Sequence, residues 1–480
     1  MSIASHGFAR PRRIARSLSL AAACLFLGVA CDLSVSEPDI ITPDNLTGVS
    51  ALPTIRDAAL GDFELAYTGS GADGSQGTEG IIMAGGLLAD EFVNSETFPT
   101  RIEVDRRSIQ VTNSSVTGWF RTLMRARRSV EYSATSYRSV TDPTADTSNQ
   151  AGFPEMVALS GYMYLFFAEN YCSGVPMSNA LPNGTLQFGP PLTTLVLIDS
   201  AVVRFRTALA AANALKSSVS ASAKTLDLNL ASVGLGRALL DSASWNNNPA
   251  GFATAAAAVA AVPTNFVYEI YHSQNTTRQN NGVYVATFLA KRYAVSDGEG
   301  TNGLLFRSSA DGRVPETRTG NGFDGATPQW NPARFINRSD PNPLATGAEA
   351  RLIEAEAFLS AGDTVNFLAR HNALRAAPPS YFAPVGGSIA ALAALTTTGL
   401  SSAQVQDLHF QEREYWLWNS GHRLADLRRL THAPYGRGAE TVFPTGAYFK
   451  GGLYGTDTNF PVPFDETNNP NFTQCIDRNP

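Results

Sequence analysis

Apolar residues recur at helical spacing in several segments of this chain, whereas long, strictly alternating strand patterns are scarce. In one segment Ile198, Val202 and Phe205 fall on a single stripe. Residues 154–171 begin with a proline suited to a first helical turn and are apolar on nearly every side, which is typical of a helix buried in a large assembly. The sequence therefore predicts a mostly α fold.

Two later segments read as pairs of helices. Residues 231–263 hold two runs rich in small residues, separated by the turn WNNNP, and residues 345–377 hold a further pair. Small residues let two helices approach closely, and such pairs resemble tetratricopeptide units without matching their residue pattern strictly. Because helical repeats grow without adding separate cores, the length of 480 residues does not by itself require several domains.

The charge of the chain bears on its partners. The formal net charge is −6 and no basic stripe is present. Binding to nucleic acid depends on clustered cations that neutralise phosphates. We therefore expect no nucleic-acid partner.

The N-terminus has the layout of a secretory signal peptide, with four arginines ahead of the apolar run LSLAAACLFLGVA. This run is too short to span a bilayer, which needs roughly 20 apolar residues, and no later segment is long and apolar enough. We predict that residues 1–30 are removed on export and that the mature protein has no transmembrane helix.

Cys31 follows small residues at the end of this leader and resembles the cysteine of a bacterial lipobox, which is diacylated and becomes the first residue of the mature chain. Gly28 stands where the usual pattern has leucine, and Cys24 is the alternative site. An ordinary signal peptide that contains two cysteines is the other interpretation. Two acyl chains suffice to hold a protein at a membrane surface, so we predict that Cys31 is a lipid anchor.

Near the C-terminus the chain reads EREYWLWNSGHRLADLRRL from Glu412 to Leu430. Ser401 and Gln404 form a capping box for a helix that runs through Trp418. On this helix Glu412 projects from an otherwise apolar stripe, so its carboxylate needs a partner. A second helix after Gly421 brings further arginines and an aspartate.

Three interpretations of this stretch are open. Glu412 and Asp426 could be the acid and base of a glycosidase, or they could join Arg413 and Arg423 in a buried ion-pair network that holds two helices together. We favour the structural network, because arginines beside both carboxylates keep them ionised and spoil a general acid. The third interpretation is a metal site, whose candidate ligands would be His409, Glu412, His422 and His432. No compact ligand spacing supports it, and we expect neither a metal nor a cofactor.

The same stretch resembles the C-terminal signature of SusD/RagB-like proteins, surface lipoproteins that partner TonB-dependent transporters. Other segments agree in order along the chain. They are CDLSVSEPDIITPDNL, NYCSGVPMS, GLGRALLDSASW, EARLIEAEAFLSAGD, HNALRA and NFPVPFDETNNPNF. Together these motifs extend from Cys31 to Phe472, nearly the whole mature chain.

The resemblance implies a single domain over residues 31–480, with four tetratricopeptide-like helix pairs and a loop-rich second region that carries the ligand site. It implies a protein of the outer membrane, on the cell surface, that captures an oligosaccharide or a peptide. The protein would deliver this ligand, as a lid, to a SusC-like, TonB-dependent transporter. No catalysis is implied, so we expect that the protein is not an enzyme.

Departures from the family pattern are informative. Trp416 and Ser420 stand where family members often have glutamate, so part of the usual charge network is absent. Cys172 replaces the glycine of the Y-G-x-V-P segment. With Cys31 acylated and the leader removed, Cys172 and Cys475 are the only remaining thiols in an oxidising compartment, and we predict a disulfide between them.

If the ligand is a glycan, exposed aromatic rings should stack on its sugar rings beside groups that bind hydroxyls. Trp330 is the best candidate because it lies in a long polar stretch, and Tyr284 and Tyr454 are weaker ones beside Gly- and Asn-rich segments. Trp119 lies in an expected helix, and we assign it to the core. Two alternatives to nutrient capture remain: a lipid-anchored helical adaptor that binds a protein partner, and a secreted hydrolase that depends on Glu412 and Asp426.

Overall fold

The computed structural model describes residues 48–71, 78–141, 147, 148, 150–180, 185–382, 387–472 and 475. Residues from Gly48 onward form one compact unit. The leader of residues 1–30 and the predicted anchor Cys31 lie outside the described residues. In the described part, none of the helices combines the length and the apolar character that a membrane crossing requires.

The unit is built mainly from helices, which confirms the predicted fold class. They are α2 (Leu52–Tyr67), α3 (Ile81–Leu88), α4 (Pro99–Asp105), α5 (Ser114–Thr141), α6 (Gly152–Asn170), α7 (Thr194–Asn213), α8 (Ala221–Trp245), α9 (Pro249–Val259), α10 (Gly282–Tyr284), α11 (Gly347–Ser360), α12 (Thr364–Ala376), α13 (Ser402–Leu417), α14 (Arg423–Thr431) and α15 (Ala439–Val442). Short turns of other helix types are η2 (Val49–Ala51), η3 (Thr277–Gln279), η4 (Val285–Leu289), η5 (Ser380–Phe382) and η6 (Phe464–Asn468).

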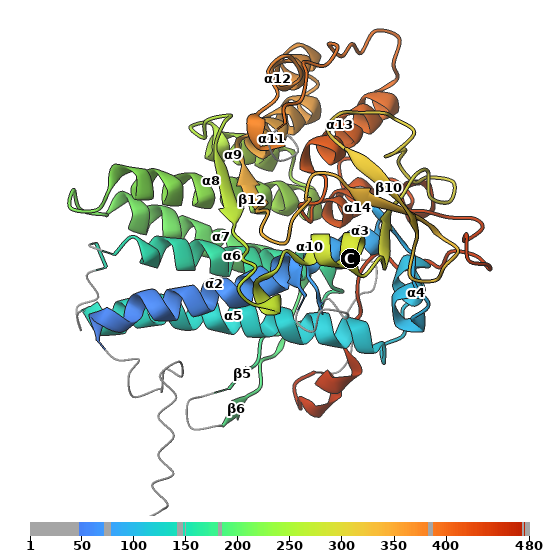
Figure 1. Cartoon of the computed structure of the whole chain (residues 1–480). Coiled ribbons are helices and arrows are strands. Elements are labelled where there is room, and N and C mark those ends of the chain that lie inside the picture. The colour runs from blue at the N-terminus through green and yellow to red at the C-terminus, as the bar shows by residue number, and fades with distance from the viewer. Residues whose placement is uncertain are drawn as a thin grey trace, which may run out of the picture. The chain divides into compact units, whose positions relative to one another are not determined.

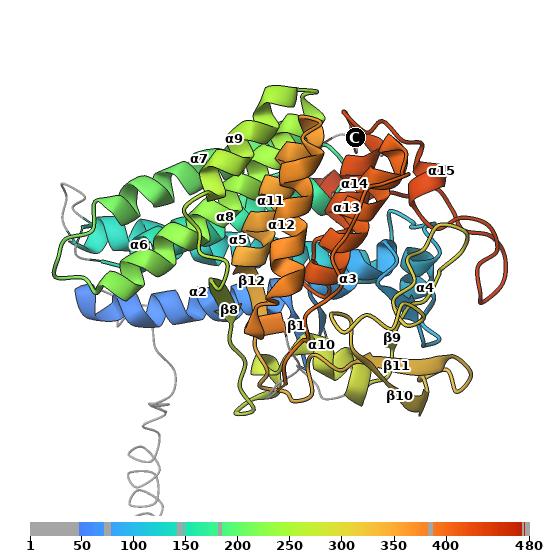
Figure 2. The same cartoon turned by 90° about the horizontal axis from the view of Figure 1, so that it is seen from above.

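The long helices pack on one another in a continuous series. The contacts run from α2 to α5, then through α6, α7, α8 and α9, and finally to α11 and α12 (Figures 1 and 2). Taken in chain order, these eight helices form four antiparallel-type pairs of the kind expected for a tetratricopeptide-like repeat. The predicted helix pairs at residues 231–263 and 345–377 correspond to α8 with α9 and to α11 with α12.

Small residues let these helices approach closely. The ring of Phe205 on α7 lies against Gly161 of α6 and Gly234 of α8. A Cβ atom at Gly234 would lie 2.2 Å from a ring carbon of Phe205, which is far inside van der Waals contact. Alanine at this position would therefore push two helices apart.

Strands are short and join loops to the helical body. All the described strands pair in two-stranded antiparallel sheets. The pairs are β1 (Gly69–Ser70) with β2 (Thr78–Glu79), β3 (Phe92–Asn94) with β9 (Tyr293–Val295), β4 (Val175–Pro176) with β7 (Pro191–Leu192), β5 (Asn179–Ala180) with β6 (Leu186–Gln187), β8 (Val267–Ile270) with β12 (Asn342–Thr346), and β10 (Glu316–Asn321) with β11 (Pro328–Pro332).

The loop-rich second region lies beside the helical series. In both cartoons α4, β10 and the loop that follows α15 lie on one side, and α7 and α8 lie on the other (Figures 1 and 2). The long polar stretch that holds Trp330 reads as a loop in the sequence, but part of it forms the hairpin of β10 and β11. Trp330 therefore lies in a strand, opposite Arg318.

Candidate functional site

The stretch that begins at Glu412 folds into α13 and α14, with the expected capping box at Ser401 and Gln404. Glu412 is buried, and its two carboxylate oxygens accept hydrogen bonds of 2.7 and 2.9 Å from the guanidinium of Arg313. Arg375 donates a third bond of 2.6 Å. These cations come from outside α13 and α14, so Glu412 ties α13 to a loop and to α12.

The other three predicted charges are also buried and paired. Arg413 donates to both oxygens of Asp426 at 2.8 and 3.0 Å, and Arg429 donates to Asp426 at 2.7 Å. Arg423 contacts Asp90 at 2.5 and 2.7 Å, which links α14 to the segment after α3. Although burial opposes ionisation, the two arginines hold the pKa of Asp426 well below its usual range.

This geometry bears on the glycosidase interpretation. Glu412 is held between Arg313 and Arg375, whereas Asp426 is held by a separate pair of guanidiniums. A carboxyl with a strongly lowered pKa is a poor proton donor at neutral pH. The arrangement therefore suits a structural bridge between elements better than acid–base chemistry.

The histidines of the same stretch lie apart. His409 contacts Glu356 at 3.1 Å, His422 contacts Glu349 at 3.0 Å, and His432 stacks on an indole ring. Within the described ranges, no group of three or more His, Cys, Asp or Glu side chains is arranged to hold a metal ion.

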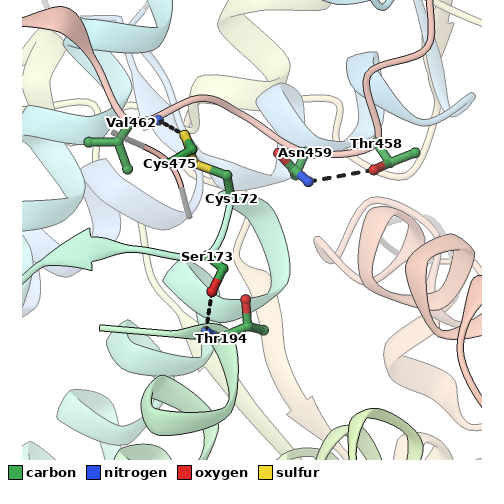
Figure 3. Close-up of a disulfide and its surroundings, with 7 residues drawn as sticks. All are labelled: Cys172, Ser173, Thr194, Thr458, Asn459, Val462 and Cys475. Atoms are coloured by element: carbon green, nitrogen blue, oxygen red, sulfur yellow. Dashed lines mark hydrogen bonds between the residues drawn. A yellow bond between two sulfur atoms is a disulfide. The ribbon is translucent and has the colours of Figure 1, made fainter. Parts of the chain in front are cut away.

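Cys172 is bonded to Cys475 in the structure, with their Cα atoms 5.8 Å apart (Figure 3). Cys172 lies just past the end of α6, and its backbone N–H donates to the carbonyl of Phe460 at 2.9 Å. Val462 N–H points to the sulfur of Cys475 at 3.4 Å (Figure 3). The C-terminal segment is thus attached to the helical body both by backbone bonds and by the disulfide.

Three phenylalanine side chains form a candidate ligand surface in the loop-rich region. Phe98 precedes α4, Phe323 lies in the turn between β10 and β11, and Phe449 lies in the loop after α15. Their side chains are 42%, 55% and 49% exposed, respectively. We call these three residues the phenylalanine surface.

Two cations hold the phenylalanine surface together. The guanidinium carbon of Arg292 lies 5.1 Å from the ring centre of Phe98 and 5.3 Å from that of Phe323. The ammonium of Lys450 lies 5.6 Å from the ring centre of Phe449. Such cation–π contacts orient the rings, and all three side chains remain partly exposed.

Lys450 also connects the loops from which these rings come. Its ammonium donates to the Asn94 side chain at 3.0 Å, to the Glu96 carbonyl at 2.6 Å and to Asp324 at 2.8 Å. Although partial burial opposes it, the bond from Lys450 and those from Thr327 and Ala326 lower the pKa of Asp324 to about 2. Asp324 is therefore ionised at neutral pH, and its two oxygens accept bonds from Lys450, Thr327 and Ala326, which fix the turn that carries Phe323.

A cavity of about 240 Å³ opens next to the phenylalanine surface. Phe449 belongs to both, and Tyr454, Arg307, Asp297 and Glu299 also line the cavity. A flat apolar ring beside hydroxyl, carboxylate and guanidinium groups can hold a ligand that has both apolar faces and many hydroxyls.

Glu299 forms a buried acid pair with Asp105 at this cavity. Tyr454 donates to Glu299 at 2.7 Å, and Tyr448 donates to Asp105 at 2.7 Å. Burial raises the pKa of Asp105 to about 6, although a hydrogen bond with Glu299 opposes this rise. Burial and the neighbouring Asp105 carboxyl raise the pKa of Glu299 well above its usual range. The pair therefore retains a proton at neutral pH and joins α4, the segment after β9 and the loop after α15.

The three aromatic residues chosen from the sequence lie in different environments. Tyr454 lines the cavity. Trp330 is half-buried against the cluster of Phe306 and Trp418, and the guanidinium of Arg307 lies 5.0 Å from its ring centre. Tyr284 is half-buried and stacks on Phe288 at 5.0 Å. The ligand roles of these three residues stay predictions.

The phenylalanine surface was missed because only tryptophan and tyrosine were considered as ligand-stacking residues. The available signal was a phenylalanine beside glycine or proline in a polar stretch, as in TFPT, NGFDG and YFKGG. Such neighbours favour turns, which leave an apolar side chain exposed.

Comparisons with known proteins support the fold. No family model matches the sequence, and no curated protein matches it. Among solved structures, a SusD-like carbohydrate binding protein from Bacteroides vulgatus is 16% identical, with a TM-score of 0.55, over 80% of this chain and 83% of that one. Surface glycan-binding protein A from Bacteroides uniformis is 13% identical, with a TM-score of 0.61, over 88% and 99% of the two chains. A SusD superfamily protein from Bacteroides fragilis is 14% identical, with a TM-score of 0.59, over the same shares.

These matches cover most of the chain and most of each neighbour. The protein therefore has the SusD-like fold, a helical repeat body with a loop-rich second region. The resemblance to SusD/RagB-like proteins that the sequence motifs indicated is confirmed at the level of the fold.

Proposed function

We propose that this protein binds an oligosaccharide at the phenylalanine surface and the adjoining cavity. The observation that carries the proposal is that Phe98, Phe323 and Phe449 come from three separate loops yet are held around Arg292 and Lys450. Structural neighbours described as glycan-binding and carbohydrate binding proteins support a glycan as the ligand class. A peptide is the other ligand class that the sequence motifs imply.

The chemistry of the surface suits sugars. Phenyl rings can pack on the apolar face of a sugar ring, and Asp297 and Arg307, which line the cavity, can bind hydroxyls. Trp330 and Tyr454 would contribute from the cavity side, Trp330 through the guanidinium of Arg307 and Tyr454 directly. We assign no catalytic role to any residue and propose binding alone.

Calorimetric titration with a panel of neutral oligosaccharides and peptides tests this proposal. Phe323→Ala should weaken binding of the ligand by roughly 1–2 kcal/mol, because stacking and burial of one ring are lost. Phe464→Ala is the matched control, since this ring is 56% exposed but belongs to η6. Equal affinities of the wild type and Phe323→Ala would remove the surface from the site.

We also propose that Cys31 anchors the protein to the outer membrane and that the captured ligand passes to a TonB-dependent, SusC-like transporter. This step rests on the leader and on the ordered sequence motifs. Cys31→Ser should move the protein from the membrane fraction to the soluble fraction. A mature wild-type mass without lipid would contradict the anchor.

Co-purification from a membrane extract of the native host tests the transporter. We expect a TonB-dependent receptor to accompany the wild-type protein. If no receptor co-purifies and no member of the ligand panel binds, the adaptor interpretation replaces nutrient capture.

A further inference from the structure

A second cavity, of about 520 Å³, lies on the helical body and not in the loop-rich region. It is bounded by α5, α6, α7 and the β5–β6 hairpin, and we call it the α5 groove. Its lining residues are Arg128, Glu131, Ala134, Thr135, Arg138, Phe153, Val157, Ser160, Asn179, Gln187, Val203, Arg204 and Thr207. None of them belongs to the phenylalanine surface or to its cavity.

One carboxylate lines the α5 groove, that of Glu131, and it is already paired within the protein. Glu131 accepts bonds from Arg127 at 2.7 Å, from Arg204 at 3.1 Å and from the Tyr164 hydroxyl at 3.0 Å. Arg204 is in turn occupied by Glu131 and by Ser160. The polar groups in the middle of the groove are therefore bonded to one another.

Positive charge remains at two other points of the α5 groove. Arg128 lies 5.7 Å from the ring centre of Tyr132, and Arg138 lies 4.9 Å from that of Phe153. Among the described residues, neither guanidinium has a carboxylate partner. An arginine that rests on an aromatic face keeps its N–H groups in plane and available to an anion.

The spacing of these two arginines along α5 indicates which kind of anion the α5 groove can bind. Arg128 and Arg138 share a face of α5 and are ten residues apart, which corresponds to about 15 Å along a helix with a rise of 1.5 Å per residue. The two guanidiniums rest on different rings, those of Tyr132 and Phe153, so a chain that carries repeated negative charges can contact both.

Neutral groups of the α5 groove favour a sugar chain over an acidic peptide. Asn179 and Gln187 face each other across the β5–β6 hairpin, and Thr135 and Thr207 add hydroxyls. Amides and hydroxyls both donate and accept, as sugar hydroxyls require. Among the apolar lining residues, Val203 is 60% exposed and can contact the apolar face of a sugar ring.

We infer that the α5 groove is a second binding site, selective for an oligosaccharide that carries repeated carboxylates. Arg128 and Arg138 bind carboxylates at its two ends, and the amide and hydroxyl side chains bind sugar hydroxyls between them. The carbohydrate class rests on the proposed function, whereas the preference for an anion rests on the groove alone.

Titration of the full chain with an oligogalacturonate, and with the same oligomer fully methyl-esterified, tests this inference. The wild type should bind the acidic form at least about tenfold more tightly than the neutral ester, and added salt should weaken this binding. Arg128→Gln combined with Arg138→Gln should lower affinity for the acidic form by at least about tenfold. Arg206→Gln, which removes the same charge from an exposed position on α7 outside the groove, should leave the affinity unchanged.

Several outcomes would overturn the inference. They are no binding of the oligogalacturonate, equal affinity for its ester, and full affinity in the double arginine variant. Binding of an oligoglutamate peptide in place of the sugar would assign the groove to a protein partner. Loss of binding in Phe323→Ala, with full binding in the arginine variant, would assign the acidic sugar to the phenylalanine surface. Neutral glycans are titrated separately, so failure at one site is distinguished from failure at the other.

Discussion

The ion-pair network of α13 and α14 and the phenylalanine surface use charge in opposite ways. In the network, Glu412, Asp426 and Arg423 are buried and each contacts an opposite charge within 3 Å. At the phenylalanine surface, Arg292 and Lys450 orient rings that remain exposed. The buried network of α13 and α14, which we call the frame, is thus separate from an exposed surface that is available to a ligand.

The largest effect is expected in the frame. Glu412→Ala leaves the buried Arg313 and the half-buried Arg375 without the carboxylate that they share. Removing one partner of a buried ion pair typically costs roughly 3–5 kcal/mol, so the free energy of unfolding should fall by about that amount. Urea denaturation measures it.

Asp407→Ala is the control for this prediction, because the ion pair of Asp407 with Arg437 is exposed at the carboxylate. It should cost less than about 1 kcal/mol. A stable Glu412→Gln variant that loses a hydrolytic activity present in the wild type would instead restore the glycosidase interpretation.

The second largest effect is expected at the disulfide that attaches the C-terminal segment to the helical body. Replacing Cys172 and Cys475 by serine opens a loop closed over 303 residues. Loss of such a disulfide should cost roughly 2–5 kcal/mol, because the unfolded chain gains conformational freedom. Thermal unfolding of the double variant measures the loss.

Thiol titration of the unfolded, unreduced wild type checks the bond itself. We expect no free thiol at Cys172 or Cys475. Two free thiols would refute the pairing.

Much of the frame could be predicted from sequence, but the partners of its charges could not. The capping box at Ser401 and a carboxylate on an apolar stripe are local patterns, and they correctly place Glu412 in a buried helix. Its partner Arg313, however, is 99 residues away along the chain. A contact of that range depends on how distant segments pack, which local spacing does not encode.

The candidate site was harder to predict for the same reason. Trp330 was chosen because it lies in a long polar stretch that reads as a loop, but the pairing of β10 with β11 makes its segment a strand. The phenylalanine surface needs three loops to meet at Arg292 and Lys450, and no single segment contains that information.

A pH-dependent effect is expected at the acid pair of Asp105 and Glu299. Their pKa values are raised in the folded protein, to about 6 for Asp105 and well above the usual range for Glu299, against about 4 in an unfolded chain. The folded state therefore binds more protons, and the stability present below about pH 4 is lost as the pH rises through about 6 and beyond.

Glu299→Gln separates this effect from other titrations. The amide stays neutral at every pH. As the pH rises from mildly acidic to mildly alkaline, the free energy of unfolding should therefore fall by at least about 1 kcal/mol less in the variant than in the wild type. Urea midpoints across this range measure the difference. Parallel pH profiles of the two proteins would show that the pair does not share a proton.

The smallest effect on stability is expected when a ring of the phenylalanine surface is removed. Phe449→Ala removes an exposed ring, so it should weaken ligand binding by roughly 1–2 kcal/mol without changing the melting temperature.

Trp330→Ala should weaken binding as well, because Arg307 lines the cavity while resting on the indole. Trp330 is half-buried against Phe306 and Trp418, so this variant should also lower the melting temperature. Calorimetry and thermal unfolding of both variants decide between roles: unchanged affinity in Trp330→Ala, with a lowered melting temperature, would assign the indole to the frame and leave the phenylalanine rings as the stacking surface.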